Sequence, residues 1–209
     1  MTQEQKLERS FFAIEGVRSN PEMVKTLKQV GWTPQETTQG WKMYEHAYGS
    51  FEEQKEKLSQ QRNATDALNA SEDALNKIYK KHLHLTRMAV PYQRNVYLTL
   101  ELNGRRKAER SAWIGQIRSF YKNIDLVVSE LAEYGVTAEE IDQAQAMIET
   151  VAAARIKQHE ARSAAQQARI DRDQSYQKLD AWMSRFIRTA RFAFAENPQQ
   201  LEALGIVVK

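Results

Sequence analysis

Cysteine is absent from this 209-residue chain, which excludes disulfides, thiolate nucleophiles and cysteine-based metal sites. With only 8 glycines and 4 prolines, few positions interrupt regular secondary structure. No long uncharged apolar run occurs, so we expect no membrane-spanning helix. Residues 1–6 are not followed by an apolar stretch, so we also expect no secretory signal and a cytoplasmic protein.

Neither sign of charge is in large excess, because 30 basic and 27 acidic residues give a net charge of +3. That balance is too mild to indicate nucleic-acid binding by itself. A ferritin-like di-iron site needs Glu-x-x-His on two helices. The histidines are His46, His82, His84 and His159, and the residues three before them are Met43, Tyr79, Lys81 and Ile156. Phosphate-binding glycine loops and nucleophile elbows are also missing, so we predict no catalytic residues, no metal site, no cofactor and no enzyme.

What the chain does contain is an internal repeat at an offset of 104 positions. Without gaps, this offset aligns Leu27 with Leu131, Gly31 with Gly135, Thr33 with Thr137, Glu36 with Glu140, Gln54 with Gln158, Ser71 with Ser175, Leu75 with Leu179 and Arg87 with Arg191. We therefore predict a single helical domain over 1–209, built from two tandem copies at 5–104 and 105–209.

Each copy begins with a shorter helix and a tight link. Asn20-Pro21 favours a capped helix start, since Asn accepts from free amides and Pro is tolerated in the first turn. Gly31 then ends that helix in the left-handed conformation. The pattern Gly-x-Thr-x-x-Glu at 31–36 returns at 135–140, and it predicts a capping box at the start of each long helix.

The long helices are expected over 35–90 and 136–197, apolar at their ends and polar in the middle. The apolar stripes are Trp41, Tyr44, Tyr48 and Phe51, then Leu75, Ile78, Tyr79, Leu83, Leu85 and Met88, and in the second copy Ile141, Ile148, Val151 and Ile156, then Leu179, Trp182, Met183, Phe186, Ile187 and Phe194. The polar middles, 52–70 and 157–175, carry opposite charge balance, so we expect them to pack side by side. A bend around 69–71 is the alternative.

A short element closes each copy. In the second copy Asn197 is expected to cap it, Pro198 to start it and Gly205 to stop it. Residues 95–103 alternate like a strand, but the repeat favours helix there. The predicted fold is an all-α, elongated antiparallel helical bundle of two short-helix/long-helix hairpins.

Several segments together resemble a known group of proteins. They are Asn20-Pro21-Glu22-Met23-Val24, the Gly31–Glu36 pattern, Gly104-Arg105-Arg106-Lys107, Arg191-Phe192-Ala193-Phe194 and Asn197-Pro198-Gln199-Gln200-Leu201. They resemble uncharacterised bacterial helical-bundle proteins of about this length, a group with no assigned activity. The resemblance implies a bacterial helical bundle and no catalytic residues.

Two basic sets are candidates for binding. Arg155, Arg162 and Arg169 share one helix face, with Arg172 nearby; they indicate either a phosphate or nucleic-acid stripe, or a face that is solvated or pairs with acids of the other long helix. Those acids are Glu52, Glu53, Glu56 and Asp66. The second set is Lys178, Arg185, Arg188 and Arg191, interleaved with Trp182, Phe186, Phe192 and Phe194, a pattern typical of core aromatics or of a surface-binding helix.

The leading functional hypothesis is a non-enzymatic protein-interaction or structural bundle that binds itself or another protein. One alternative is a bundle that binds a small apolar ligand among its aromatic residues. These are Trp32, Trp41, Trp113 and Trp182, with Tyr44, Tyr48 and Tyr121. The other alternative, nucleic-acid binding through the arginine stripes, is less favoured, and 104–107 is expected to be an exposed linker and helix start.

Overall fold

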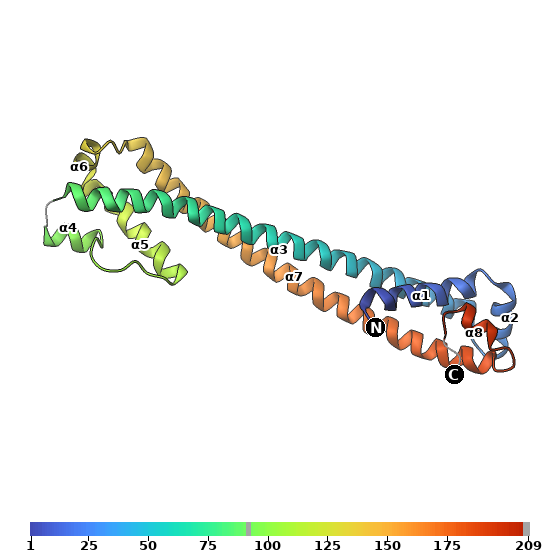
Figure 1. Cartoon of the computed structure of the whole chain (residues 1–209). Helices are drawn as coiled ribbons and strands as arrows, with labels where there is room; N and C mark the ends of the chain where they lie inside the picture. Colours follow the sequence, from blue (N-terminus) through green and yellow to red (C-terminus); the bar gives the residue numbers. More distant parts are fainter. Residues whose placement is uncertain (91–92, 207–209) are drawn as a thin grey trace. The chain divides into compact units, whose positions relative to one another are not determined.

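A computed structural model describes residues 1–90 and 93–206 (Figure 1). Within these ranges the chain is helical and contains no strand, and the long helices α3 (Pro34–Ala89) and α7 (Ala138–Ala193) pack closely in an antiparallel bundle. The all-α antiparallel prediction is therefore confirmed. No helix in the described ranges combines the length and apolarity needed to cross a membrane. Parts of the two predicted copies, at 91–92 and 207–209, lie outside the described residues.

Each long helix is one uninterrupted stretch of 56 residues. The shorter elements are α1 (Gln3–Arg18), α2 (Pro21–Gln29), α4 (Arg94–Thr99), α5 (Arg110–Lys122), the 3-10 turn η1 (Ile124–Leu126), α6 (Val128–Glu133) and α8 (Gln199–Ala203). Of the segment 95–103 that alternates like a strand, only the part up to Thr99 is helical, within α4; residues 100–103 form a turn and irregular chain.

Helix ends recur at a constant spacing along the chain. Four pairs of helices end 104 residues apart: α1 and α5 at 18 and 122, α2 and α6 at 29 and 133, α3 and α7 at 89 and 193, and α4 and α8 at 99 and 203. The backbone after the last pair also matches, because Glu101 has a φ of 48° and Gly205 a φ of 67°.

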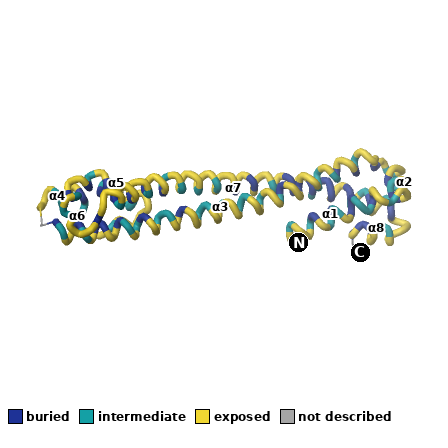
Figure 2. Tube along the Cα trace, turned by 90° about the horizontal axis from the view of Figure 1, so that it is seen from above, coloured by how far each residue is buried: buried dark blue, intermediate teal, exposed yellow. Residues whose placement is uncertain are grey.

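The chain folds into two compact units. Unit 1 contains Met1–Ser59 and Ser163–Lys209, and unit 2 contains Gln60–Arg162. Each unit combines parts of α3 and α7 with its own short helices and has its own buried cluster (Figure 2). Because both units draw on both predicted copies, neither unit corresponds to a single copy.

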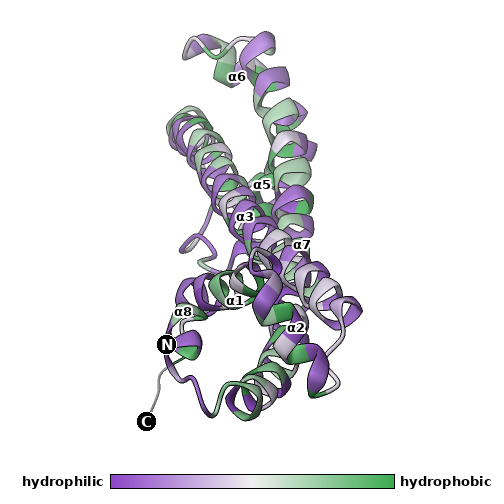
Figure 3. Cartoon of the chain, turned by 90° about the vertical axis from the view of Figure 1, so that its right-hand side faces the viewer, coloured by the Kyte–Doolittle hydropathy of each residue, from purple (hydrophilic) through white to green (hydrophobic). Residues whose placement is uncertain are grey.

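The core of unit 1 is built around Trp182 of α7. Its ring stacks on Phe186 with centroids 5.3 Å apart and meets Trp32 edge-on at 5.4 Å. Its indole N–H donates to the Glu36 carbonyl of α3 at 3.1 Å. Gly40 lets α3 approach the ring, because a Cβ there would lie 2.2 Å from it. The surrounding helices α1, α2 and α8 each carry hydrophobic and hydrophilic residues (Figure 3), as expected of helices that cover a core.

The core of unit 2 packs α3 against α5. Tyr79 of α3 meets Phe120 edge-on at 5.4 Å, and Phe120 meets Tyr121 at 5.2 Å. His82 is fully buried, and its Nδ1 lies 3.0 Å from the Tyr121 hydroxyl. Burial raises the pKa of Tyr121, so this hydroxyl keeps its proton at neutral pH.

The loop before α5 is more than the exposed linker that the sequence suggested. Arg106 is half-buried, and its guanidinium donates to the Tyr79 hydroxyl at 2.9 Å. It also donates to the main-chain carbonyls of Glu101, Asn103 and Gly104. The helix itself begins later, at Arg110, so Arg106 anchors a loop and does not start a helix.

Predicted helix ends can be compared residue by residue. Asn20 accepts from two amides of α2, and Gly31 and Gly135 have φ values of 84° and 77°; these predictions are confirmed. Asn197 makes no side-chain cap, because α8 begins at Gln199 with Pro198 as its preceding residue.

Each predicted capping box forms only half of its reciprocal pair. The Thr33 amide donates to the Glu36 carboxylate at 2.9 Å, whereas in the second copy the Glu140 amide donates to the Thr137 hydroxyl at 3.2 Å. The Glu140 carboxylate instead accepts from Lys81 of α3 at 2.7 Å. The carboxylate that a capping box would use thus binds a residue of α3, a helix far from Glu140 in the sequence.

Candidate functional site

A groove between α1 and the first half of α3 gathers aromatic side chains in unit 1. This aromatic groove, with a volume of about 420 Å³, is lined by Glu4, Leu7, Glu8, Phe11, Phe12, Tyr44, Tyr48, Phe51, Glu52 and Lys55. All its residues lie within 1–59, so it belongs to unit 1 alone.

The aromatic groove leaves two of its aromatic rings half exposed, and one of them, Tyr48, belongs to a predicted apolar stripe. Phe12 is 53% exposed and Tyr48 is 50% exposed. Phe11 and Tyr44 meet at 5.7 Å, and Tyr44 stacks on Tyr48 at 6.2 Å. Phe11, Tyr44 and Tyr48 therefore form a continuous row of aromatic rings from α1 to the exposed side of α3. Helix α1 thus covers only part of this row, and Phe12 and Tyr48 stay half exposed.

Cations already lie over the aromatic faces at the two ends of this row. The Arg18 guanidinium sits 4.3 Å from the Trp41 ring centroid, and the Lys55 ammonium sits 4.8 Å from the Phe51 centroid. Such contacts are attractive because the ring face is electronegative. Burial, followed by the neighbouring Tyr48, raises the pKa of Tyr44, so Tyr44 remains a neutral ring and hydroxyl.

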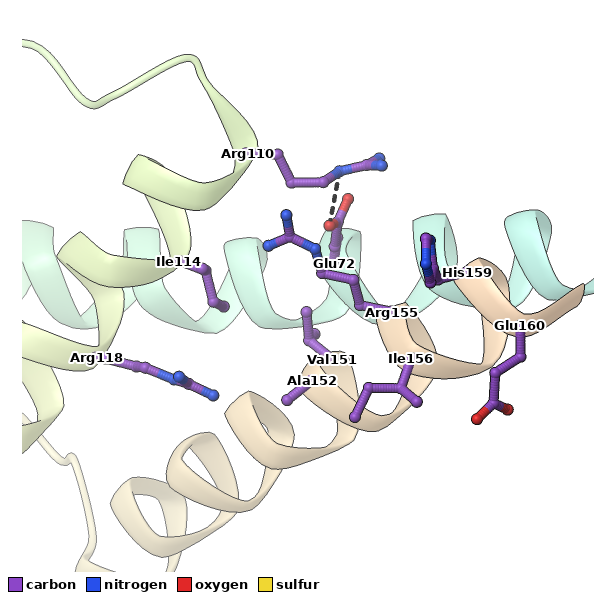
Figure 4. A pocket seen from close by; sticks show the side chains of 10 residues that line it. All are labelled: Glu72, Arg110, Ile114, Arg118, Val151, Ala152, Arg155, Ile156, His159 and Glu160. Carbon is purple, nitrogen blue, oxygen red and sulfur yellow. Dashed lines mark ion pairs between the residues drawn. The ribbon is translucent and has the colours of Figure 1, made fainter. Parts of the chain in front are cut away.

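A second concave site, in unit 2, combines arginines with apolar side chains. This arginine pocket has a volume of about 490 Å³ and lies between α3, α5 and α7 (Figure 4). It is lined by Glu72, Arg110, Ile114, Arg118, Val151, Ala152, Arg155, Ile156, His159 and Glu160. Ile156, a member of a predicted apolar stripe, is 61% exposed because it lies on this open surface.

The predicted arginine stripe contributes only one member to that pocket. Arg155 lines it, whereas Arg162 and Arg169 lie elsewhere on the exposed surface of α7. Arg172 donates to Gln54 of α3 at 3.2 Å and pairs with Asp173 of its own helix at 2.5 Å. Arg155, Arg162 and Arg169 are all exposed, as expected if this face is solvated.

The second basic set is mainly a core face. Trp182, Phe186 and Phe194 are buried, whereas Phe192 is 76% exposed. Arg185 pairs with a carboxylate of α3, that of Glu36, at 3.1 Å. The core interpretation therefore fits three of the four aromatics, and the exposed ring stands at the end of α7.

A histidine and a serine from distant positions meet in unit 1. His46 Nδ1 lies 3.0 Å from the Ser175 hydroxyl, which also accepts from Ser50 at 3.0 Å. Ser175 donates its own proton to the Asp171 carbonyl at 2.7 Å. The contact between His46 and Ser175 joins α3 to α7 within unit 1.

His82 is the most buried of the histidines. Its Nε2 lies 3.8 Å from the Glu140 carboxylate, beyond hydrogen-bond distance. Burial lowers the pKa of His82, and Glu140 opposes that effect. Among residues 1–90 and 93–206, no group of three or more histidines and acids is placed to hold a metal ion.

The two concave sites were not predicted from the sequence. The sequence did show apolar residues at helical spacing beside charged residues, but only the fold shows which apolar side chains stay uncovered. Comparisons with protein families, with curated proteins and with solved structures found no match to this chain.

Proposed function

We propose that this chain is a non-enzymatic protein-interaction module whose aromatic groove binds an amphipathic, basic helix of a partner protein. The observation that carries the proposal is the continuous, half-exposed aromatic row between α1 and α3, with Phe12 and Tyr48 at 53% and 50% exposure. Exposed apolar patches of this kind typically mark interaction surfaces.

The geometry of the groove suits a helix. Tyr44, Tyr48 and Phe51 occupy successive turns of α3, and Leu7 and Phe11 line the opposite side from α1. Two helices thus present apolar side chains toward one trough. An amphipathic helix that lies in such a trough buries residues spaced at i, i+3 or i+4, and i+7.

The charge of the groove selects a basic occupant. Its rim carries three carboxylates, those of Glu4, Glu8 and Glu52, against the single ammonium of Lys55. Lys55 also pairs with Glu52 at 3.2 Å, which leaves Glu4 and Glu8 on the α1 side facing solvent. Complementary charge of this kind favours the correct partner and speeds its encounter.

The architecture supports a binding role over a catalytic one. The four pairs of helix ends spaced 104 residues apart support an origin by duplication of a helical hairpin, which needs no active site. Ser175, the serine that meets His46, also lies within hydrogen-bond distance of the Asp171 carbonyl, which suits a contact between helices. A bundle whose open surfaces are apolar and charged can act by association alone.

Two designed peptides with identical leucine positions test the proposal directly. One carries lysine and the other glutamate at the polar positions, and binding is measured by fluorescence anisotropy. We expect the lysine peptide to bind and the glutamate peptide to bind at least about tenfold more weakly. Glu8→Lys and Glu52→Lys should each weaken binding of the lysine peptide.

Glu53→Lys provides the matched control, because Glu53 neighbours Glu52 on α3, is exposed and does not line the groove. It should leave affinity nearly unchanged. Equal binding of the two peptides, or equal losses in Glu52→Lys and Glu53→Lys, would contradict the proposal. A doubling of mass in light scattering that disappears in Glu8→Lys would instead assign the groove to a second copy of the chain.

A further inference from the structure

The arginine pocket of unit 2 is a second concave site, separate in sequence and chemistry from the aromatic groove. We infer that it binds a small apolar acid, a molecule with one carboxylate head and a hydrocarbon body. The inference does not depend on the proposed function, because no residue of the arginine pocket lines the aromatic groove.

The apolar part of the pocket is supplied by two helices. Ile114 comes from α5, and Val151, Ala152 and Ile156 come from α7. Val151 is buried and fixes the inner wall, whereas Ile156 is 61% exposed at the opening. Together these residues form an apolar surface, and the rest of the described chain leaves Ile156 largely uncovered. A hydrocarbon chain bound against this surface would bury apolar area, both its own and that of the pocket, which favours binding.

The polar part of the pocket is dominated by guanidinium groups. Arg110 and Arg118 come from α5 and Arg155 comes from α7, so two helices supply the cations (Figure 4). Arginine forms two parallel hydrogen bonds with a carboxylate, which fixes both its position and its orientation. Three arginines beside an apolar wall therefore suit an acid with a hydrophobic body.

The charges within the pocket are only partly neutralised. Arg110 lies 2.9 Å from Glu72, and Arg118 lies 3.8 Å from Glu149. Arg155 makes no hydrogen bond or ion pair with any residue in 1–90 or 93–206, although its charge also acts on the carboxylate of Glu109. Arg155 is thus the cation with the most capacity for a new anion.

The remaining carboxylate of the pocket does not compete for that position. Glu160 extends from α7 away from Arg155 and Arg110 (Figure 4). His159, on the same helix, is exposed at the edge of the pocket. Among the lining residues, three arginines against two glutamates leave one net positive charge, which Glu149 outside the lining partly offsets at Arg118. This small excess matches a single carboxylate head better than a dianionic phosphate.

The size of the pocket favours a small molecule over a protein segment. Its volume of about 490 Å³ falls within the 300–1,000 Å³ range of ligand sites. A charged head and an apolar wall in one such cavity describe a medium-chain carboxylic acid. Acidic peptides share the head group but need a longer trough, so they are an outcome of the test and not the proposal.

Isothermal titration calorimetry with dodecanoate, below its micellar concentration, tests the inference. Dodecanol and dodecyltrimethylammonium keep the chain and change the head, and acetate keeps the head and removes the chain. We expect dodecanoate to bind at least about tenfold more tightly than each of the three. Equal binding of dodecanol or dodecyltrimethylammonium would overturn the assignment of the arginines, and equal binding of acetate would overturn that of the apolar wall.

Variants then locate the site. Arg155→Gln should weaken dodecanoate binding about tenfold or more, because a charge-assisted hydrogen bond is lost. Arg162→Gln is the matched control, an exposed arginine seven residues along α7 that does not line the pocket. Arg155 is itself exposed, so its replacement should leave the melting temperature unchanged.

The carboxyl signal of ¹³C-labelled dodecanoate gives a second readout. In the unaltered protein it should shift on binding, and in Arg155→Gln that shift should shrink. Unchanged affinity in Arg155→Gln, or equal losses in Arg155→Gln and Arg162→Gln, would overturn the inference. Binding of a Leu/Glu peptide without binding of dodecanoate would also overturn it and would assign the surface to an acidic protein segment.

Discussion

Replacing Gly40 by alanine tests how closely α3 approaches α7 in unit 1. A Cβ at this position would lie 2.2 Å from Cζ2 and 2.5 Å from Cε2 and Cη2 of Trp182. The ring has little freedom to move, since it is only 4% exposed and stacked on Phe186. Its N–H also donates to the Glu36 carbonyl. The substitution therefore forces a shift in a filled core.

The magnitude follows from two opposing effects. Alanine favours a helix interior over glycine by about 1 kcal/mol. Overpacking of a core typically costs about 1–3 kcal/mol, and a shift of Trp182 that breaks its bond to Glu36 adds about 1 kcal/mol. We expect Gly40→Ala to lower the free energy of unfolding by about 1–3 kcal/mol.

Gly49 provides the control on the same helix. Nothing lies within 4 Å of a Cβ built there, so Gly49→Ala should raise the free energy of unfolding by about 0.5–1 kcal/mol. Urea denaturation, followed by circular dichroism and by tryptophan fluorescence, measures both variants. If Gly40→Ala is as stable as Gly49→Ala, the packing of α3 on Trp182 is refuted.

Three further perturbations probe unit 2 and the helix ends. Burial lowers the pKa of His82 below its usual value of 6.5. The unfolded chain therefore binds the proton more readily, and the free energy of unfolding should fall as the pH drops below about 6.5. The melting temperature should change with pH between 5 and 8 to the same extent in the unaltered protein and in His84→Gln, which replaces an exposed histidine. Tyr121→Phe leaves the buried Nδ1 of His82 without its partner and should cost about 1–3 kcal/mol in urea denaturation; an unchanged midpoint would contradict the contact. Gly31→Ala and Gly135→Ala place a side chain at φ values of 84° and 77°, and each should lower stability by about 1–2 kcal/mol in the same assay; a gain in either variant would contradict the left-handed turn.

Features set by short stretches of sequence were predicted well. The Asn20 cap and the turn at Gly31 depend on the geometry of a few consecutive residues, and local chemistry decides them. The long helices followed from a shortage of helix-breaking residues. The contact of the Glu140 carboxylate could not be predicted from local sequence. It binds Lys81 on another helix and not the amide of Thr137 that a capping box would offer.

The concave sites could not be predicted in the same way. Helical spacing places Tyr48 and Ile156 on apolar faces, but it does not show whether another helix covers them. In the structure both are at least half exposed, at 50% and 61%. Their exposure depends on where the short helices α1 and α5 pack, which is decided by tertiary contacts. The burial of His82 was missed for the same reason, since its partner Tyr121 comes from α5.

Photo-crosslinking in living cells tests the central claim, that the chain acts by binding a partner helix in the aromatic groove. A benzophenone amino acid replaces Tyr48 in the groove or, as a control, Glu45, which is exposed on α3 and does not line it. The account predicts that position 48 yields a covalent adduct, and that mass spectrometry maps it to a helical segment rich in leucine and lysine or arginine. Adducts of equal yield at position 45, or an adduct that maps to an acidic or non-helical segment, would contradict it.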